Sequence, residues 1–216
     1  PALPAAAAIE LLHEFSLIHD DIEDGDRERR HRPTVWVHWG KAQAINAGDG
    51  LFALSQLVLL GLREQDLPAD LILKAQVRFN ETAVRLCQGQ FLDISFERRR
   101  VVRPDEYLAM ISGKTAALLG CAAELGGLVA GAADDDLTGL QTFGAALGVA
   151  FQMQDDLLGI WGDPARTGKP AGNDIRKRKK SLPVTIALAG ESPESAALRD
   201  LYTQRTLDDR AVAEAL

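Results

Sequence analysis

The sequence of 216 residues predicts an all-α fold, a bundle of helices that forms a single domain. Long stretches rich in Ala, Leu and Gln repeat their apolar residues with helical spacing, at about 41–62, 69–97, 105–131 and 135–160. No stretch shows the sustained alternation and the enrichment in Val, Ile and Thr that are typical of strands. A chain of this length can bury one sizeable core, so we expect one domain over residues 1–216.

The individual helices are indicated by their apolar faces and by the residues at their ends. Ile9, Leu12 and Leu17 give the first helix an apolar face, and this helix runs up to an acidic cluster at Asp20. Later helices begin and end at residues that favour such positions. Starts are marked by Pro68, Pro104 and Asp134-Asp135-Asp136, and Gly61 and Gly131 lie near ends.

Charge and composition exclude several classes of protein. A net charge of −7 argues against a nucleic-acid binder and against a protein that binds membranes through a basic surface. Charged residues interrupt each apolar run before it reaches the roughly 18 residues that a membrane span needs, and the Ala-rich start lacks the basic region of a signal peptide. We therefore expect a cytoplasmic protein without a membrane span, with Cys87 and Cys121 as buried thiols.

The first chemical motif is Asp20-Asp21-x-x-Asp24. Asp20 and Asp24 are four residues apart, so both carboxylates project from one helical face, one turn apart. Like charges at this spacing destabilise a helix, and a hard divalent cation with oxygen ligands is a natural compensation. His13 lies on the same helical face. The alternative is a solvated helix end whose charges point to water.

A second acidic pair, Asp155-Asp156, lies at the polar end of an apolar approach from Phe143 to Phe151. A core helix that ends in water would also give this pattern. Both acidic clusters are followed by basic residues, however, the first by Arg27, Arg29, Arg30 and Arg32 and the second by the run 176–180. A site for metal ions and phosphate groups requires both kinds of residue, because carboxylates bind the cations and basic side chains bind the phosphates.

Lys114 lies inside an apolar helical stretch. The tripeptide Gly113-Lys114-Thr115 is not part of a nucleotide-binding P-loop, because the required glycine is replaced by Leu108 and no strand precedes it. Gly113 can allow a kink that aims the Lys114 ammonium inward. A surface lysine that extends along the helix is the alternative.

Taken together, these motifs resemble the trans-isoprenyl diphosphate synthase (polyprenyl synthetase) family. They follow the order and the approximate spacing of that family between residues 10 and 183, which makes the set far more specific than any single motif. The matching segments are Glu10-x-x-His13, His19-Asp20-Asp21-Ile22-Glu23-Asp24, Arg29-Arg30-His31-Arg32-Pro33-Thr34, Gly89-Gln90-x-x-Asp93, Gly113-Lys114-Thr115, Phe151-Gln152-x-x-Asp155-Asp156, and Gly168-Lys169 leading to Asp174, Lys179 and Leu182-Pro183.

The resemblance implies an isoprenoid-synthase helical bundle around a central cavity, with a metal site at its mouth. Three Mg²⁺ ions would be bound by Asp20, Asp24 and Asp155, with Asp21 and Asp156 helping directly or through water. The substrates would be an allylic diphosphate and isopentenyl diphosphate, condensed head-to-tail into a longer all-trans prenyl diphosphate. A homodimer is also implied.

The resemblance further assigns residues to the two substrates. The allylic diphosphate would be held by Arg29, Lys114 and Lys169, and the diphosphate of isopentenyl diphosphate by Arg30 and His13. Arginine suits this task because its planar fork donates two parallel hydrogen bonds. The Thr115 hydroxyl, the Lys114 carbonyl and Gln152 would face the allylic cation, which an apolar cavity keeps from water.

Product length in this family depends on residues four and five before the first aspartate, here Ser16 and Phe15. A small side chain one turn below Asp20 leaves room for a long prenyl tail. This combination resembles enzymes that form C20 products more than those that form C15, so we expect geranylgeranyl diphosphate, with farnesyl diphosphate next. The alternative is that both residues simply pack in the core.

Two features depart from the family pattern. The second motif usually ends in a third aspartate, but position 159 is Gly; we expect metal binding to survive because its first aspartate carries most of the role. The chain also begins just before the first motif and looks short at its end, so the helices of the family that precede this point, and part of the C-terminus, are expected to be absent from it.

Two other functions are compatible with parts of this pattern. A class I terpene cyclase shares the bundle, the metal cluster and the ionisation step, but does not need a second diphosphate site such as His13 and Arg30 would provide. A non-catalytic subunit of a heteromeric synthase would keep the fold and bind a catalytic partner. Such subunits often lose an acidic motif, whereas this chain keeps the first complete and the second largely so.

Overall fold

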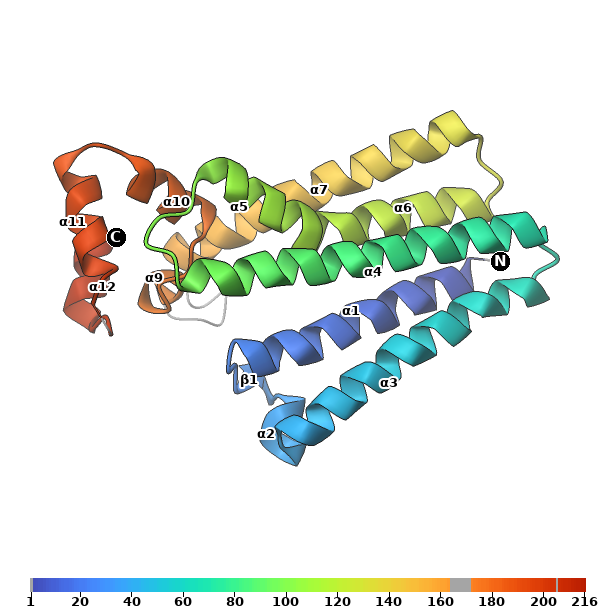
Figure 1. Cartoon of the computed structure of the whole chain (residues 1–216), viewed down its shortest axis with the longest axis horizontal. Coiled ribbons are helices and arrows are strands. Elements are labelled where there is room, and N and C mark those ends of the chain that lie inside the picture. The colour runs from blue at the N-terminus through green and yellow to red at the C-terminus, as the bar shows by residue number, and fades with distance from the viewer. Residues whose placement is uncertain (1, 164–171, 205) are drawn as a thin grey trace.

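A computed structural model describes residues 2–163, 172–204 and 206–216 of the chain. Long helices run in alternating directions side by side, and shorter helices gather at one end of the bundle (Figure 1). The long helices are α1 (Leu3–Glu23), α3 (Lys41–Leu60), α4 (Ala69–Glu97), α6 (Ala117–Val129) and α7 (Asp134–Trp161). The shorter elements are β1 (Glu28–Arg29), β2 (Arg32–Pro33), α2 (Val35–Trp39), the 3₁₀ turn η1 (Gly61–Glu64), α5 (Pro104–Ile111), the π-helical turn η2 (Ser112–Ala116), α9 (Asn173–Arg176), α10 (Leu182–Ala189), α11 (Pro193–Leu201) and α12 (Asp209–Ala215).

The all-α prediction is confirmed, and the predicted helix limits are close to those observed. α4 covers 69–97 as predicted, and α7 begins at Asp134, where three aspartates occupy the first turn and favourably oppose the helix dipole. α5 begins at Pro104, whose missing N–H costs nothing in the first turn. The stretch predicted as one helix over 105–131 is divided by the π-helical turn η2.

A two-stranded hairpin, β1 paired antiparallel with β2, was not predicted. Arg30 and His31, which connect the strands, both have positive φ, 52° and 61°. Two consecutive residues of this kind form a type I′ turn, which usually contains Asn or Gly. The sequence rule therefore failed here because neither residue is a turn former. The hairpin directly follows α1 and places Arg29 beside the first acidic motif.

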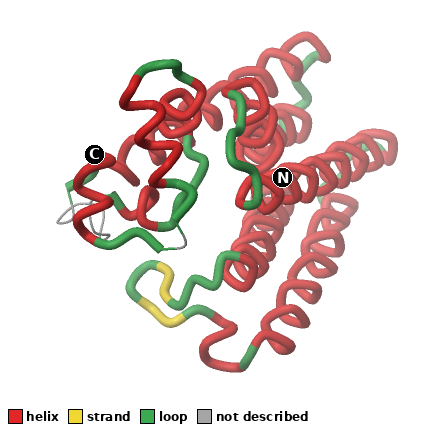
Figure 2. Tube along the Cα trace, turned by 60° about the vertical axis from the view of Figure 1, so that its left-hand side comes forward, coloured by secondary structure: helices red, strands yellow, loops and turns green. Residues whose placement is uncertain are grey.

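Two packed clusters fix the positions of the elements. The larger cluster joins α1, α3, α4 and α6 through fully buried side chains, among them Leu12, Leu59, Phe79 and Leu125. The second joins the end of α7 to the C-terminal helices through Ile160, Ile175, Val184 and Leu188. This second cluster holds the C-terminal helices at the end of α7, the end of the bundle where the hairpin also lies (Figure 2).

Two helical segments, Lys41–Glu64 and Pro104–Val129, are long and apolar enough to cross a membrane by length and composition. The same properties are found in core helices of soluble proteins, and α6 contributes Leu125 to the main core. Leu54, Leu57 and Leu60 of α3 are exposed. The length and composition of these segments do not test the predicted absence of a membrane span, which stays a prediction.

Candidate active site

Lys114 enters the site from the π-helical turn η2, where α4 and η2 cross at two glycines. A Cβ on Gly89 would lie 2.1 Å from the backbone nitrogen of Lys114, and one on Gly113 would lie 2.8 Å from the carbonyl oxygen of Arg85. The missing side chains allow the two backbones to touch, and the wider π turn accommodates the crossing. The predicted distortion at Gly113 is confirmed.

The Lys114 ammonium points inward, toward two carboxylates. Its Nζ donates to Oδ1 of Asp20 at 2.8 Å and to Oδ2 of Asp93 at 2.6 Å. Burial lowers the pKa of Lys114, but attraction to Asp93 and Asp20 outweighs it, so the pKa lies above its usual value. The Lys114 ammonium of η2 thus connects an aspartate of α1 with an aspartate of α4.

The acids of the first motif have opposite electrostatic environments. Burial acts to raise the pKa of Asp20, but Lys114 and then Arg29 outweigh it, so the pKa falls below its usual value. Burial by neighbouring groups, followed by repulsion from Asp20, raises the pKa of Asp24 to about 6, although the residue as a whole remains exposed. The pKa of Asp24 is therefore raised while that of Asp20, one turn earlier in the sequence, is lowered.

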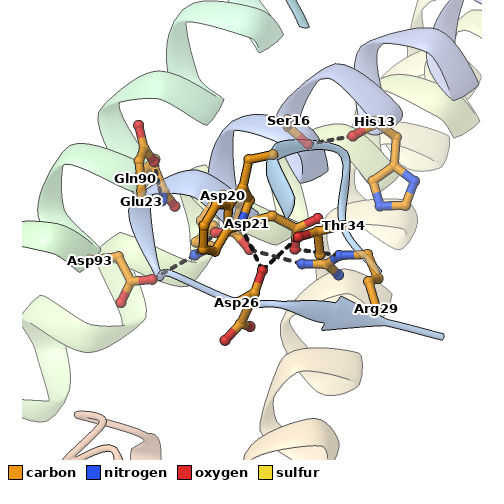
Figure 3. A network of polar contacts seen from close by, with 12 residues as sticks. His13, Ser16, Asp20, Asp21, Glu23, Asp26, Arg29, Thr34, Gln90 and Asp93 are labelled. Carbon is orange, nitrogen blue, oxygen red and sulfur yellow. Dashed lines mark hydrogen bonds and ion pairs between the residues drawn. The ribbon is translucent and has the colours of Figure 1, made fainter. Parts of the chain in front are cut away.

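Arg29 of the hairpin pairs with both leading aspartates. Its Nε donates to Oδ1 of Asp21 at 2.8 Å, and its Nη2 lies 3.3 Å from Oδ2 of Asp20 (Figure 3). Asp21 is only 4% exposed, and burial is the main reason that its pKa is raised. Metal binding by Asp21 remains a prediction. Its observed contact supports a role in which Asp21 orients Arg29.

In the second motif, Asp155 and Asp156 point to different surroundings. Asp155 is exposed, whereas Asp156 is 1% exposed and accepts hydrogen bonds at both oxygens. Tyr107 Oη and the Leu182 backbone N–H donate to its Oδ2, the latter at 2.7 Å, and Gln152 Nε2 donates to its Oδ1 at 3.1 Å. Of the two roles predicted for Asp156, this arrangement favours the indirect one.

Gln152 also fixes the hydroxyl of Thr115. Thr115 Oγ1 donates to Gln152 Oε1 at 2.8 Å, so two of the three groups predicted to face the allylic cation lie together, on η2 and α7. The carboxylate of Asp156 in turn holds the Gln152 amide. A connected set of hydrogen bonds therefore links η2, α7 and α5 below the exposed Asp155.

The predicted substrate contacts on α1 lie farther back along this helix. The side chains of Glu10, His13 and Glu14 each bring one possible metal-ligand atom within 4.8 Å of the other two. Arg30 Nη1 lies 3.5 Å from Glu14 Oε1. Two carboxylates beside His13 oppose its predicted role as a diphosphate ligand, and Arg30 offsets part of that charge. The Ser16 hydroxyl donates to the His13 carbonyl at 2.7 Å.

Phe15 packs between α1 and α3. Its ring centroid lies 5.3 Å from that of Phe52 and 4.9 Å from that of His19. These contacts correspond to core packing, the alternative that the sequence left open for this residue. Lys169, the remaining predicted diphosphate ligand, lies outside the described residues.

The residues of the first motif fit a divalent cation. Asp20, Asp24 and Asp93 offer carboxylate oxygens, which are the ligands that hard cations such as Mg²⁺ prefer. Burial and then repulsion from Asp20 raise the pKa of Asp24, and a bound cation would oppose both effects. In the structure, Lys114 and Arg29 neutralise part of the same negative charge.

Comparison with known proteins assigns this arrangement to a family. The sequence profile described as polyprenyl synthetase matches residues 1–216. The chain belongs to the polyprenyl synthetase family. Its resemblance to that family, first suggested by the order of the motifs, is thereby confirmed.

Several members of the polyprenyl synthetase family are closely similar to this chain. The geranylgeranyl diphosphate synthase of Mycobacterium tuberculosis is 48% identical over 201 residues, which are 93% of this chain and 56% of the relative. A (2E,6E)-farnesyl diphosphate synthase of Mycobacterium bovis is 48% identical over 188 residues, 87% of this chain and 51% of the relative. The chain thus spans about half the length of these curated relatives.

Solved structures of the family have the same fold. The geranylgeranyl pyrophosphate synthase of Corynebacterium glutamicum, in complex with isoprenyl diphosphate and magnesium, superposes with a TM-score of 0.84 at 30% identity. The match covers 99% of this chain and 64% of that one. The relatives are named as geranylgeranyl and farnesyl diphosphate synthases, so neither a terpene cyclase nor a non-catalytic subunit is favoured.

Four residues of this polyprenyl synthetase site received no role from sequence reasoning: Asp93, Tyr107, Asp174 and Lys179. Asp93, Asp174 and Lys179 lie within the matched motifs, so their positions in the motifs were the available signal. Tyr107 gave no such signal. Its partner Asp156 is 49 residues away in the sequence, and only the packing of α5 against α7 brings them together.

Proposed function

We propose that this protein is a Mg²⁺-dependent trans-isoprenyl diphosphate synthase, a prenyltransferase that condenses isopentenyl diphosphate with an allylic diphosphate. The observation that carries this proposal is the Lys114 ammonium held between Asp20 and Asp93 beside Asp24. Divalent cations at these carboxylates would take over their neutralisation. Lys114 and Arg29 would then be available to donate hydrogen bonds to diphosphate oxygens.

The chemistry requires stabilisation of a leaving diphosphate. Three Mg²⁺ ions, held by Asp20, Asp24 and Asp155 with Asp21 and Asp156 in support, would supply the Lewis acid at this position. Lys114, Arg29 and Lys169 would bind the same diphosphate with fixed donors, which cost no reorganisation as charge develops. The magnesium in the Corynebacterium glutamicum relative supports this assignment.

The remaining residues would manage the carbon chemistry. Thr115 and Gln152, joined by a hydrogen bond of 2.8 Å, would present oxygen atoms to the allylic cation. His13 and Arg30 would hold the diphosphate of isopentenyl diphosphate, whose double bond attacks that cation. The departing pyrophosphate would then remove the proton.

We propose geranylgeranyl diphosphate as the main product. The small Ser16 one turn below Asp20 supports a long product, and so does the Mycobacterium tuberculosis relative. The farnesyl diphosphate synthase of Mycobacterium bovis, at the same 48% identity, makes the C15 product the direct competitor. Because Phe15 packs against Phe52, length control would rest on Ser16 rather than on Phe15.

One experiment tests both activity and length. The protein is incubated with labelled isopentenyl diphosphate and with geranyl or farnesyl diphosphate, with Mg²⁺ or with EDTA, and the extracted products are separated by length. We expect Mg²⁺-dependent C20 product, and shorter product from Ser16→Phe. Mainly C15 product would overturn the length assignment. A cyclised hydrocarbon formed without isopentenyl diphosphate would overturn the synthase itself.

We further propose that the protein is a homodimer that works in the cytoplasm without spanning a membrane. An exposed apolar stripe runs along α4, formed by Leu73, Val77, Val84 and Phe91, and Phe91 is 71% exposed. The spacing of four and seven residues is that of helices that pack side by side. Light scattering after gel filtration should show twice the chain mass, and Val84→Asp should give the monomer.

A further inference from the structure

The second acidic motif ends at Gly159, and the space next to this glycine is filled. A Cβ at position 159 would lie 2.2 Å from Oδ2 of Asp174 and 2.6 Å from its Cγ. Both distances are far below van der Waals contact, so no side chain fits at 159 while Asp174 keeps its place. The carboxylate of Asp174 therefore takes the volume that a side chain at position 159 would need.

This carboxylate lies beside the face of α7 that carries Asp155. Residues 155 and 159 are four apart in one helix, so they project from the same face one turn apart. The backbone N–H of Gly172 donates to the Ile160 carbonyl at 2.9 Å, which ties the start of α9 to the end of α7. Ile175, next to Asp174, is buried against Ile160 in the second core cluster. Packing thus holds Asp174 in position.

Asp174 is also coupled to the first motif through Lys179. The Asp174 carbonyl accepts a hydrogen bond from the Lys179 backbone N–H at 2.8 Å, which closes a tight turn. Burial lowers the pKa of the Lys179 ammonium, but attraction to Asp174, Asp93 and Asp24 outweighs it and raises the pKa. Lys179 is therefore attracted both by Asp174, beside the second motif, and by Asp24 of the first motif.

We propose that Asp174 supplies the carboxylate that the second motif lacks at position 159, and that it holds a divalent cation together with Asp155, directly or through one water. Gly159 and Asp174 are then a matched pair: the glycine is required because the acid comes from α9 instead of α7. This inference deepens the proposed function and rests on it.

An exchange of the acid between the two positions tests the pair. Three variants are compared with the wild type: Asp174→Ala, Gly159→Asp, and the double variant. Mn²⁺ binding is measured by electron paramagnetic resonance in the presence of inorganic pyrophosphate. Asp174→Ala should weaken Mn²⁺ binding about 10–100-fold, as loss of a supporting ligand does. Gly159→Asp should also weaken it, because the new side chain displaces Asp174. The double variant should recover most of the lost affinity.

Two controls separate metal binding from folding. Asp135→Ala removes an exposed acid from the first turn of the same helix, about 30 Å from Asp155 by helix rise, and should bind Mn²⁺ like the wild type. Asp174→Asn keeps the shape of the side chain and removes its charge. In EDTA its circular dichroism spectrum should match that of the wild type, which shows that the helical fold is kept, and it should still bind Mn²⁺ more weakly.

The results distinguish this inference from the proposed function. The role of Asp174 would be overturned if Asp174→Asn bound Mn²⁺ with wild-type affinity. It would also be overturned if the double variant lost as much Mn²⁺ affinity as the two single variants lose together. If the wild type forms prenyl product while the exchange has no effect, the inference alone fails. If the exchange behaves as expected but no prenyl product forms, the metal site stands and the synthase assignment fails.

Discussion

Lys114 and Asp20 are 94 residues apart in the sequence, and the Lys114 Nζ lies 2.8 Å from the Asp20 Oδ1. The same ammonium contacts Asp93, so one cation holds two acids from two helices. This arrangement links fold stability to the chemistry of the site, because the group that would bind diphosphate also neutralises the acids that would bind metal.

Lys114→Met should therefore reduce both stability and activity. Removal of Lys114 from this partly exposed cluster takes the ammonium away from Asp93 and leaves Asp20 with Arg29 alone, at a cost of about 1–3 kcal/mol in EDTA, below the value for fully buried pairs. Loss of a fixed donor to a developing anion should lower product formation about 100- to 1,000-fold. Urea unfolding and product assays check the two effects.

The matched control for this variant is Lys74→Met. Lys74 also pairs with an aspartate, Asp134, but the Asp134 side chain is 86% exposed. Water screens an exposed pair, which then contributes little to stability, so this variant should unfold and react almost like the wild type. Equal losses of stability in both lysine variants would contradict the role given to the cluster.

The contact between Gly89 and Lys114 makes a second prediction. Gly89→Ala places a Cβ 2.1 Å from the Lys114 backbone nitrogen, so α4 and η2 must separate. We expect a loss of about 1–3 kcal/mol, as for other overpacked sites. Gly126→Ala in α6, where a Cβ meets nothing within 4 Å, should instead stabilise the helix by up to about 1 kcal/mol. Urea unfolding of both variants checks the opposite signs.

Sequence reasoning succeeded where the signal was local and failed where it depended on tertiary contacts. The limits of α4 followed from helical periodicity, and Gly113 indicated that the helix could be distorted near Lys114. The role of Gly89 could not be predicted, because its crowding comes from a backbone 25 positions away in the sequence. The replacement of an acid at Gly159 by Asp174 was hidden for the same reason.

The cysteines show a similar division, and they provide a third prediction. Both were expected to be buried, but Cys87 is exposed and only Cys121 is buried. Burial raises the pKa of the Cys121 thiol from 9.0 to about 11. Iodoacetamide at pH 8 should therefore modify Cys87 and leave Cys121 intact, as mass spectrometry of the folded protein would show. Modification of Cys121 at the rate of Cys87 would contradict the packing of α6.

The same shift predicts a pH dependence of stability. The folded protein keeps the Cys121 proton to higher pH than the unfolded chain does, so ionisation favours unfolding. Stability should fall as the pH rises from about 9 to about 11, by up to about 3 kcal/mol for a shift of this size. Cys121→Ala should lose this part of the pH dependence, which urea unfolding at pH 8, 9.5 and 11 would measure.

The final prediction concerns two buried tyrosines in opposite situations. Tyr107 donates its hydroxyl hydrogen to Asp156, whereas the buried hydroxyl of Tyr202 has no hydrogen-bond partner among the described residues. Tyr107→Phe should cost about 1–3 kcal/mol, because it removes a donor from a buried carboxylate, and it should lower activity by loosening Gln152. Tyr202→Phe removes an unpaired polar group and should be neutral or stabilising. Equal effects of the two substitutions on urea unfolding would show that Asp156 is held by Gln152 and Leu182 without the help of Tyr107, and would leave the connection from α5 to the site without an energetic role.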